Sequence, residues 1–381
     1  MANFVNFGNG QDSILNVTTS VVDVPIDSSC SGTAGASTLS ATNASFVAGQ
    51  MVFICQMRGT NVGKAEINYI SSYTAGTVTL AIPLTYTYTD SGASQAQIIV
   101  VKQHSAINVT AGQTLTSKIW DGDTGGVLVL ACSGLASILG TMSAYARGYA
   151  GGVSVGRLTH GRQGEGTLTS GGSATTASNG NGAGGGQNGS GDGGSGGGGS
   201  HYTSGGGGAS RDGRPGGGPG ATVGGNPFTD IFMGGGGGSG SGDEDGNYSG
   251  YGGRGGGIVI LIARQFYVPG LLDSRGQDGG HGSNNTGTGG MGGGGGAAGG
   301  TCYIIGVRGE VTPYCFNVSG GAMGLAGGSP GDGRGGGGPG GHGVTGIKAC
   351  SVTGVPAGYF GTYVPQLGGH SFCGDLAQII G

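Results

Sequence analysis

The amino-acid sequence predicts an all-β protein that also contains packed polyglycine II helices and almost no α-helix. Three observations support this fold class. The first part of the chain has short runs rich in Val, Ile, Thr and Tyr between turn residues, glycine dominates the middle of the chain, and an aliphatic β pattern recurs inside the glycine-rich part. No amphipathic helical pattern longer than about two turns interrupts these features.

The N-terminal region, residues 1–124, is predicted to form a small β-sandwich or barrel. Its glycine content is ordinary, and its apolar runs are short and separated by turn residues, which is the pattern of an all-β unit. We expect this region to attach or brace the remainder of the chain. The expected strands are Ile14 to Val17, Phe46 to Gln56, Ala65 to Ser71, Thr77 to Ala81, Ala96 to Val101 and Ala106 to Val109.

An internal repeat runs through the glycine-rich region, residues 125–345. Each copy consists of Gly-Gly, an aliphatic strand, a short turn, a second apolar strand and an exit into more glycine, and the copies occupy residues 125–152, 256–280 and 299–328. Because the first strand of each copy is almost continuously apolar, both of its faces should be covered, and we expect these strands to stack on one another. They are Val127 to Ala131, Ile258 to Ala263 and Tyr303 to Val307.

The glycine tracts alternate with these apolar rungs, and 78 of the 101 glycines lie from Gly151 to Gly346. Each ordered residue costs roughly 1 to 2 kcal/mol of backbone entropy, so the tracts are either disordered or held by backbone hydrogen bonds. Collagen is excluded, because strict Gly-X-Y is absent and the chain has only 11 prolines. A flexible linker is the alternative, but a linker needs no aliphatic rungs.

In the polyglycine II conformation the chain has three residues per turn and its N–H and C=O groups point outward. A helix surrounded by other helices should therefore need glycine at every position, as in Gly234 to Gly238 or Gly292 to Gly296. A helix on the rim can carry side chains outward, as we expect within Gly184 to Gly199. The remaining residues, 346–381, are predicted to form a C-terminal β and loop segment.

Composition and charge exclude several classes of function. Only 9% of the residues are charged and the formal net charge is −4, which argues against nucleic-acid binding. The longest aliphatic run, Ile258 to Ala263, is far shorter than a membrane span of roughly 20 residues. Because Met1 to Asn16 has neither a basic segment nor an apolar segment of a secretory signal, we expect no signal peptide and folding in the cytoplasm.

The sequence predicts no enzyme, cofactor or metal site. Matches to GxGxxG and GxSxG occur, but the surrounding glycine makes chance matches frequent and the strand-to-helix context is missing. The GDEDGN segment lacks the terminal glutamate of a calcium loop. The seven cysteines include no CxxC pair, and bridges between Cys302 and Cys315 or between Cys350 and Cys373 stay open beside the alternative of reduced thiols.

The inserts between glycine runs are the expected binding surface, because loops on a rigid scaffold commonly carry function. They are His201 to Ser204, Ala221 to Met233, Asp243 to Tyr251 and His281 to Thr286. Aromatic rings beside Asn and Asp suit stacking on sugar rings or contact with an apolar protein patch. The candidate receptor-binding residues are His201, Tyr202, Phe228, Phe232, Tyr248, Tyr251, Asn284 and Asn285. Alternatively, Phe228, Ile231 and Phe232 pack into the neighbouring rungs or against another subunit.

Two resemblances extend these expectations. The alternation of glycine tracts and short inserts over residues 150–345 resembles the distal tail-fibre adhesins of T-even-like bacteriophages, in which packed polyglycine helices carry receptor-binding loops. The segments FVAGQMVFICQMRGTNVGKAEINYISSY, PLTYTYTDSGASQAQIIVVKQHSAINVTAGQTLT and WDGDTGGVLVL resemble the β-rich N-terminal portion of glycine-rich proteins of phage tails and bacterial surfaces. The second resemblance implies no particular mode of attachment.

These resemblances imply a non-enzymatic adhesin in a virion tail fibre or tail tip, extracellular after assembly. Its expected partners are a host cell-surface glycan or an outer-membrane protein, and other tail or fibre proteins, with no nucleic acid and no membrane insertion. Both a trimer and a monomer are compatible with the sequence. The alternative is a structural subunit of a virion or extracellular fibre, whose glycine tracts and apolar rungs drive assembly. An ice-binding protein would need a flat face of regularly spaced Thr or Ala, which the tracts lack.

Overall fold

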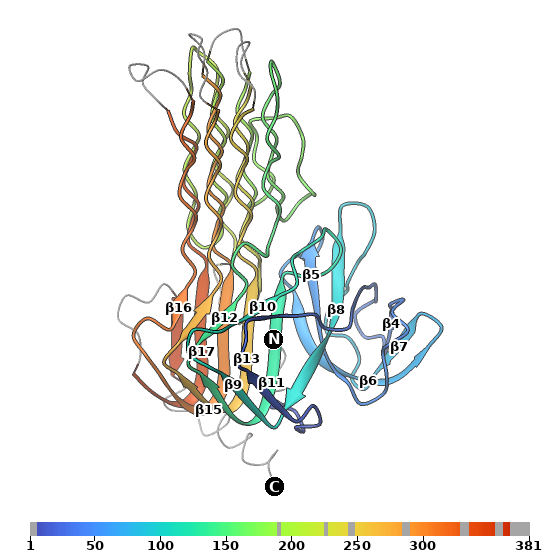
Figure 1. Cartoon of the computed structure of the whole chain (residues 1–381). Helices are drawn as coiled ribbons and strands as arrows, with labels where there is room; N and C mark the ends of the chain where they lie inside the picture. Colours follow the sequence, from blue (N-terminus) through green and yellow to red (C-terminus); the bar gives the residue numbers. More distant parts are fainter. Residues whose placement is uncertain are drawn as a thin grey trace.

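The computed structural model describes residues 6–188, 192–224, 228–242, 248–283, 290–327, 335–354 and 361–365. Every regular element within these ranges is a β-strand, which confirms the predicted all-β class. None of the described residues belongs to a helix that is long and apolar enough to cross a membrane. Figure 1 shows two parts: β-sheets form a base, and the glycine tracts rise from it as a bundle of coiled threads.

The larger sheet contains 13 strands and combines the N-terminal region with the repeats. Its path runs in the order β18-β17-β15-β13-β11-β8-β5-β6-β7-β4, and β1, β3 and β9 pair beside this path. The N-terminal strands are β1 (Ile14–Val17), β3 (Asp27–Ser29), β4 (Thr38–Ser40), β5 (Met51–Arg58), β6 (Ala65–Thr74), β7 (Thr77–Leu80), β8 (Gln95–His104) and β9 (Ala106–Val109). The remaining strands are β11 (Val127–Ile138), β13 (Ile258–Val268), β15 (Thr301–Val311), β17 (Val344–Thr353) and β18 (Gly361–Pro365).

The smaller sheet has five parallel strands in the order β16-β14-β12-β10-β2. These strands are β2 (Val21–Asp23), β10 (Thr114–Ser117), β12 (Thr141–Ser143), β14 (Leu271–Asp273) and β16 (Phe316–Asn317). Each copy of the sequence repeat therefore gives its first strand to the large sheet and its second strand to the small sheet.

The first strands of the repeat lie side by side, as predicted, and their pairing is parallel. Val127 aligns with Ile258 and Ile258 with Thr301, and a further strand, β17, continues the stack with Val344 opposite Thr301. The three predicted copies of the repeat do not include β17. Its run VTGIKACSVT mixes polar and apolar residues, so it lacks the continuous aliphatic signal of the other copies.

Both faces of the stacked strands are covered, which also confirms the prediction. Alternate residues such as Leu128, Val259 and Ile304 pack in a core with residues of the small sheet. Their neighbours, such as Val129 and Ile260, pack in a second core with Phe53, Ile99 and Trp120 of the N-terminal region. Alternation along a strand sends successive side chains to opposite faces, so one apolar run contributes to both cores.

The N-terminal region does not form the separate small sandwich or barrel that we expected. β8 pairs with β11 in parallel, so the antiparallel strands β5 to β8 form a wing of the same large sheet, seen on the right in Figure 1. Two predicted strands, Ile14 to Val17 and Ala106 to Val109, have the expected bounds. The strand expected from Phe46 begins only at Met51, because the chain turns at Gly49 with φ of 88°.

Backbone hydrogen bonds between glycine tracts repeat every three residues along the chain. Residues 234–242 show the pattern in full, since successive N–H groups donate to three different stretches in rotation. The first set, Gly234, Gly237 and Gly240, donates to the stretch 250–256. The second set, Gly235, Gly238 and Ser241, donates to 194–200. The third set, Gly236, Ser239 and Gly242, donates to 159–165. The carbonyl groups of the same tract accept from 292–298, from 183–186 and from Gly152, so the tract has bonded neighbours on six sides.

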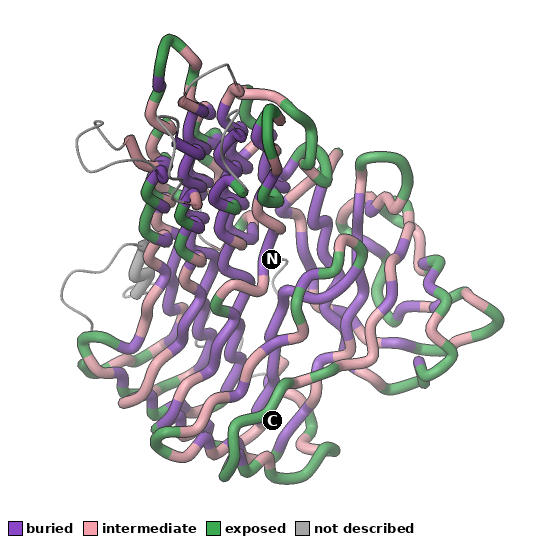
Figure 2. The backbone as a smooth tube through the Cα atoms, turned by 45° about the horizontal axis from the view of Figure 1, so that its top comes forward, coloured by how far each residue is buried: buried purple, intermediate pink, exposed green. Residues whose placement is uncertain are grey.

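The tracts 193–200 and 290–300 are enclosed in the same way. All residues described in the three tracts are buried, and Figure 2 shows them as the purple interior of the bundle. A Cβ on Gly237 would lie 2.1 Å from the carbonyl oxygen of Gly295, and one on Gly295 would lie 1.8 Å from that of Gly197. Glycine is therefore required in Gly234 to Gly238 and Gly292 to Gly296, as predicted.

The structure tests two sequence-based statements about side chains, one on Ser195 and one on the cysteines. Ser195, expected on the rim, is fully buried, and its hydroxyl donates to Gly335 O at 3.2 Å. Cys302 and Cys315 are buried free thiols, so the bridge left open between them is absent. Cys350 is disulfide-bonded, whereas Cys373 lies outside the described residues.

Candidate functional site

The distal end of the glycine bundle, where the tracts end, lies farthest from the sheets (Figure 1). Gly242 donates to Thr159 O and Gly193 donates to Gly290 O at this end, whereas Gly256 and Gly300 meet the strands at the other end. Exposed residues gather at the described reversals, as the green segments at the bundle tip in Figure 2 show. The enclosed tracts thus expose little along their length, and the described chain reversals carry exposed side chains.

Two of the predicted receptor-binding residues lie toward this distal end. Tyr248 is 66% exposed and Tyr251 is 46% exposed. The N–H of Tyr248 donates to Ser283 Oγ at 3.1 Å, and the N–H of Ser283 donates to Tyr248 O at 3.0 Å, so these two tract ends are joined. Asn284 and Asn285, the next two candidates, lie outside the described residues.

The other predicted residues lie at the opposite end of the bundle, beside the sheets. Phe228 stacks on Tyr303 with ring centroids 4.4 Å apart, and Phe232 meets the edge of His201 at 6.2 Å. His201 and Phe232 are buried, so neither presents a surface to a receptor, whereas Tyr202 is 44% exposed. This packing agrees with the alternative that the aromatic insert contacts the neighbouring rungs, because Ile231 belongs to the second core.

His201 is a structural side chain in this arrangement. Its Nδ1 lies 2.9 Å from the carbonyl oxygen of Gly299, and since a carbonyl only accepts, Nδ1 carries the proton and donates. Burial lowers the pKa of His201 to about 4, against smaller opposing effects of hydrogen bonds to the backbone of Gly299 and Gly300. The neutral imidazole therefore joins the tract 193–200 to the tract 290–300 at the base of the bundle.

A buried ion pair, the distal clamp of Asp192 and Arg211, fixes the tip. Arg211 Nη2 lies 2.6 Å from Asp192 Oδ2, and both side chains are largely buried. Arg211 Nη1 also donates to Gly327 O at 3.2 Å, and Asp192 Oδ1 accepts from the N–H of Gly290 at 2.6 Å. One guanidinium thus joins three segments of the chain, at residues 192, 211 and 327. This pair was not among the predicted residues, although an arginine among glycines needs an acidic partner when it is buried.

A small hollow of about 200 Å³ opens near the tip, a feature that the sequence did not indicate. It is lined by His160, Ala174, Thr175, Thr176, Gly186 and Gln187. His160 Nδ1 accepts the N–H of Asn188 at 3.2 Å, which orients the ring. Hydroxyl, amide and imidazole groups line the hollow, so it suits a small hydrogen-bonding group of a ligand.

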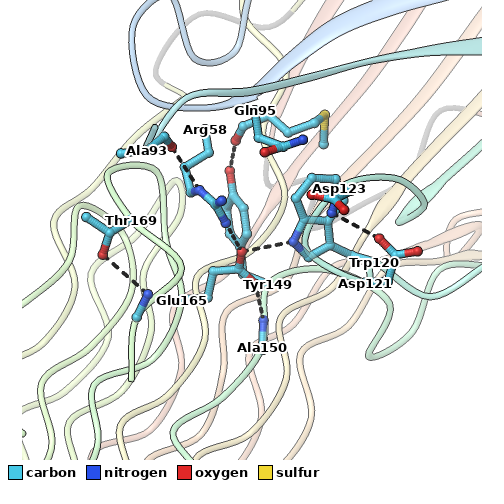
Figure 3. Close-up of polar contacts among 12 residues, drawn as sticks. Arg58, Ala93, Gln95, Trp120, Asp121, Asp123, Tyr149, Ala150, Glu165 and Thr169 are labelled. Carbon is cyan, nitrogen blue, oxygen red and sulfur yellow. Dashed lines mark hydrogen bonds and ion pairs between the residues drawn. The ribbon is translucent and has the colours of Figure 1, made fainter. Parts of the chain in front are cut away.

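A second buried ion pair, the proximal clamp of Arg58 and Glu165, joins the bundle to the large sheet (Figure 3). Arg58 Nη1 lies 2.5 Å from Glu165 Oε1, which also accepts Trp120 Nε1–H at 3.0 Å. Glu165 Oε2 accepts the N–H of Ala150 at 2.9 Å. Burial raises the pKa of the Glu165 carboxyl, while the hydrogen bonds from Ala150 and Trp120 and the charge of Arg58 act in the opposite direction.

Comparisons with known proteins give little similarity. No protein-family model and no curated protein matches the chain. Among solved structures, the Gp54 tailspike of Acinetobacter baumannii bacteriophage AP22, in complex with A. baumannii capsular saccharide, is similar with a TM-score of 0.21 and 8% identity. The match covers 90% of this chain and 51% of the tailspike, so the chain spans about half the length of that protein. A TM-score this low does not establish a shared fold.

Proposed function

We propose that the protein is a non-enzymatic adhesin of a phage tail fibre or tail tip, which binds a host cell-surface glycan or outer-membrane protein through the distal end of its glycine bundle. The observation that carries this proposal is the pair of exposed aromatic side chains toward the bundle tip, Tyr248 and Tyr251, beside enclosed tracts whose described residues are all buried. A rigid scaffold with variable loops at one end is a common form of binding site. The resemblance of the glycine tracts to tail-fibre adhesins supports the same role.

Within this proposal the glycine tracts are polyglycine II helices packed as a sandwich. The three-residue period of the lateral hydrogen bonds supports this conformation, which has three residues per turn and no internal hydrogen bonds. The distal and proximal clamps support a rigid mounting, because each joins chain segments far apart in sequence. Residues 1–124, as part of the base, then brace the bundle, and the protein acts in the virion, outside the bacterial cell.

The adhesive role is tested with fluorescently labelled protein on a panel of Gram-negative strains. Starting from a strain that binds, Tyr248→Ala should weaken binding by at least about tenfold, which corresponds to 1.4 kcal/mol. The matched control is Tyr202→Ala, at an exposed tyrosine of the opposite end of the bundle, which should leave binding unchanged. Equal effects of the two substitutions, or none from either, would contradict the assignment of the distal end.

The alternative, a structural subunit that assembles through its tracts and rungs, predicts a different result in the same preparation. Sedimentation of the purified protein would then show concentration-dependent polymers, and no strain in the panel would bind. An adhesin instead gives a discrete species and strain-specific binding. Hydrolysis of a bound glycan, measured as release of reducing ends, would overturn the non-enzymatic part of the proposal.

A further inference from the structure

A second hollow, the sheet groove, lies on the large sheet away from the glycine bundle. Its volume is about 340 Å³, and it crosses β11, β13, β15 and β17. The lining residues are Leu135, Gln265, Phe266, Tyr267, Arg308, Gly309, Glu310, Ser351 and Thr353. None of these residues belongs to the distal end or to either clamp, so the groove is independent of the adhesive site.

The strand register arranges the groove side chains in two rows. Leu135, Gln265, Arg308 and Ser351 align across the four strands, and two residues further along Tyr267, Glu310 and Thr353 align in the same way. Neighbouring strands lie about 4.8 Å apart and residues i and i+2 roughly 7 Å apart, so the rows form a small grid of polar groups. The intervening Phe266 points to the opposite face and packs in the first core.

The groove exists because the apolar coverage of this face stops partway along the strands. Ile258, Ile260 and Ile262 of β13 pack in the second core, but Arg264 and Tyr267 are exposed. β15 changes in the same way, from the buried Tyr303 and Ile305 to an exposed Arg308. The N-terminal region therefore covers the half of the face near the bundle, and no other described segment covers the remaining half.

Several polar side chains of the groove make no internal bonds within the described part of the chain. Among the described residues, the side chains of Gln265, Tyr267, Arg308 and Glu310 have no hydrogen-bond or ion-pair partner. Arg308 and Glu310 project from the same strand two residues apart, yet they do not pair with each other. Donors and acceptors are thus both available, beside one aromatic ring that is 40% exposed.

We propose that the sheet groove binds a neutral oligosaccharide. Arg308 disfavours a cation and Glu310 disfavours an anion, so a ligand without net charge fits both. Sugar hydroxyl groups donate and accept hydrogen bonds, which matches the Arg, Glu, Gln, Ser and Thr side chains of the grid. The apolar face of a pyranose ring fits the exposed ring of Tyr267 and the side chain of Leu135.

The test measures binding of maltohexaose, cellohexaose and chitohexaose to the full chain by isothermal titration calorimetry. At least one of them should bind, and Tyr267→Ala and Arg308→Met should each weaken its affinity by about tenfold or more. The matched control is Tyr314→Ala, since Tyr314 is 81% exposed but lies outside the groove. Melting temperatures of all variants should match the parent, because the changed side chains are exposed.

Three results would overturn the proposal. The first is that none of the three oligosaccharides binds, and the second is that Tyr267→Ala and Arg308→Met leave the affinity unchanged. The third is loss of binding in Tyr248→Ala but not in Tyr267→Ala, which would move the saccharide to the distal end and support the adhesive role instead. For a neutral ligand the affinity should also change less than about twofold between roughly 50 mM and 500 mM NaCl.

Discussion

The β-sheet base and the glycine bundle are stabilised by opposite means. In the base, each strand of the repeat sends alternate aliphatic side chains to two cores, so burial of apolar surface stabilises the fold. In the bundle, the enclosed tracts bury mostly backbone, and lateral hydrogen bonds to six sides take the place of side-chain packing. Side chains specify the base, whereas their absence specifies the bundle.

The two parts are joined because the glycine tracts continue directly into the strands of the base. The tract 249–257 continues directly into β13 and the tract 290–300 into β15, so the parallel register of the strands sets the spacing of the tracts. The base supplies hydrophobic stabilisation that glycine lacks, and the bundle extends that order away from the sheets. Adding a methyl group to the bundle and removing one from the base should therefore have very different effects.

The largest expected effect is that of a methyl group inside the bundle. In Gly237→Ala the new Cβ would clash with the backbone of Gly295, and no neighbour can move without breaking its own hydrogen bonds. Several buried groups would lose partners at about 1–3 kcal/mol each, so we expect a loss of more than about 5 kcal/mol. Chemical denaturation followed by circular dichroism measures this loss.

The control for that substitution is Gly207→Ala, in an exposed part of a glycine tract. A Cβ there meets its nearest atom, Pro219 Cδ, at 3.9 Å, so the change should be neutral or stabilising by about 0.4–1 kcal/mol. Equal destabilisation by the two substitutions would show that enclosure of the tract is not the cause.

The second effect tests the junction between base and bundle. Glu165→Gln leaves the guanidinium of Arg58 buried without a counter-charge, and breaking a buried pair in this way costs about 3–5 kcal/mol. The double variant Arg58→Met/Glu165→Gln removes the uncompensated charge and keeps an acceptor for Trp120, so it should be more stable than Glu165→Gln alone. A double variant as unstable as the sum of both single variants would exclude this coupling.

The third effect is a pH dependence at the base of the bundle. The pKa of His201 is about 4 in the folded chain, against 6.5 for an ordinary histidine. The free energy of unfolding should therefore be highest above pH 6.5 and should fall as the pH drops from 6.5 toward 4, because only the unfolded chain binds the proton in that range. The loss should amount to roughly 3 kcal/mol at most. In His201→Gln this part of the pH dependence should disappear, while His281→Gln, at an exposed histidine, should retain it. Unfolding curves at several pH values would show whether the variants differ.

The smallest effect concerns the base. Ile260 is fully buried in the second core, and Ile260→Val removes one methyl group at a cost of about 0.5–1.5 kcal/mol. The fold should persist with a small shift of the denaturation midpoint. A loss comparable to that of Gly237→Ala would mean that base and bundle do not differ in the way described.

Much of the base could be predicted from the sequence because its signal is local. The run Ile258 to Ala263 shows by itself that a strand is buried on both faces, and the glycine run Gly234 to Gly238 shows by itself that no side chain fits. The merging of the N-terminal strands with the repeats could not be predicted, because pairing of β8 with β11 depends on contacts between separate segments. β17 lacked the aliphatic run that marks the other copies.

The site was harder to predict than the fold, for a physical reason. Phe228 and Tyr248 both lie in aromatic inserts between glycine runs, yet one is stacked on Tyr303 and the other is exposed. Which end of the bundle an insert occupies depends on how many tracts precede it, and composition does not record that number. Likewise, Arg58 and Glu165 are 107 residues apart, so only the folded chain brings their charges together.

Amide hydrogen exchange of the glycine tracts, read by mass spectrometry on proteolytic fragments, tests most directly whether backbone hydrogen bonds hold the bundle together. We expect the amides of 193–200, 234–242 and 290–300 to be protected as strongly as those of β13, because both are buried and bonded. Exchange of these tracts at the rate of an unstructured chain, with β13 still protected, would contradict the claim that lateral backbone hydrogen bonds hold the bundle together.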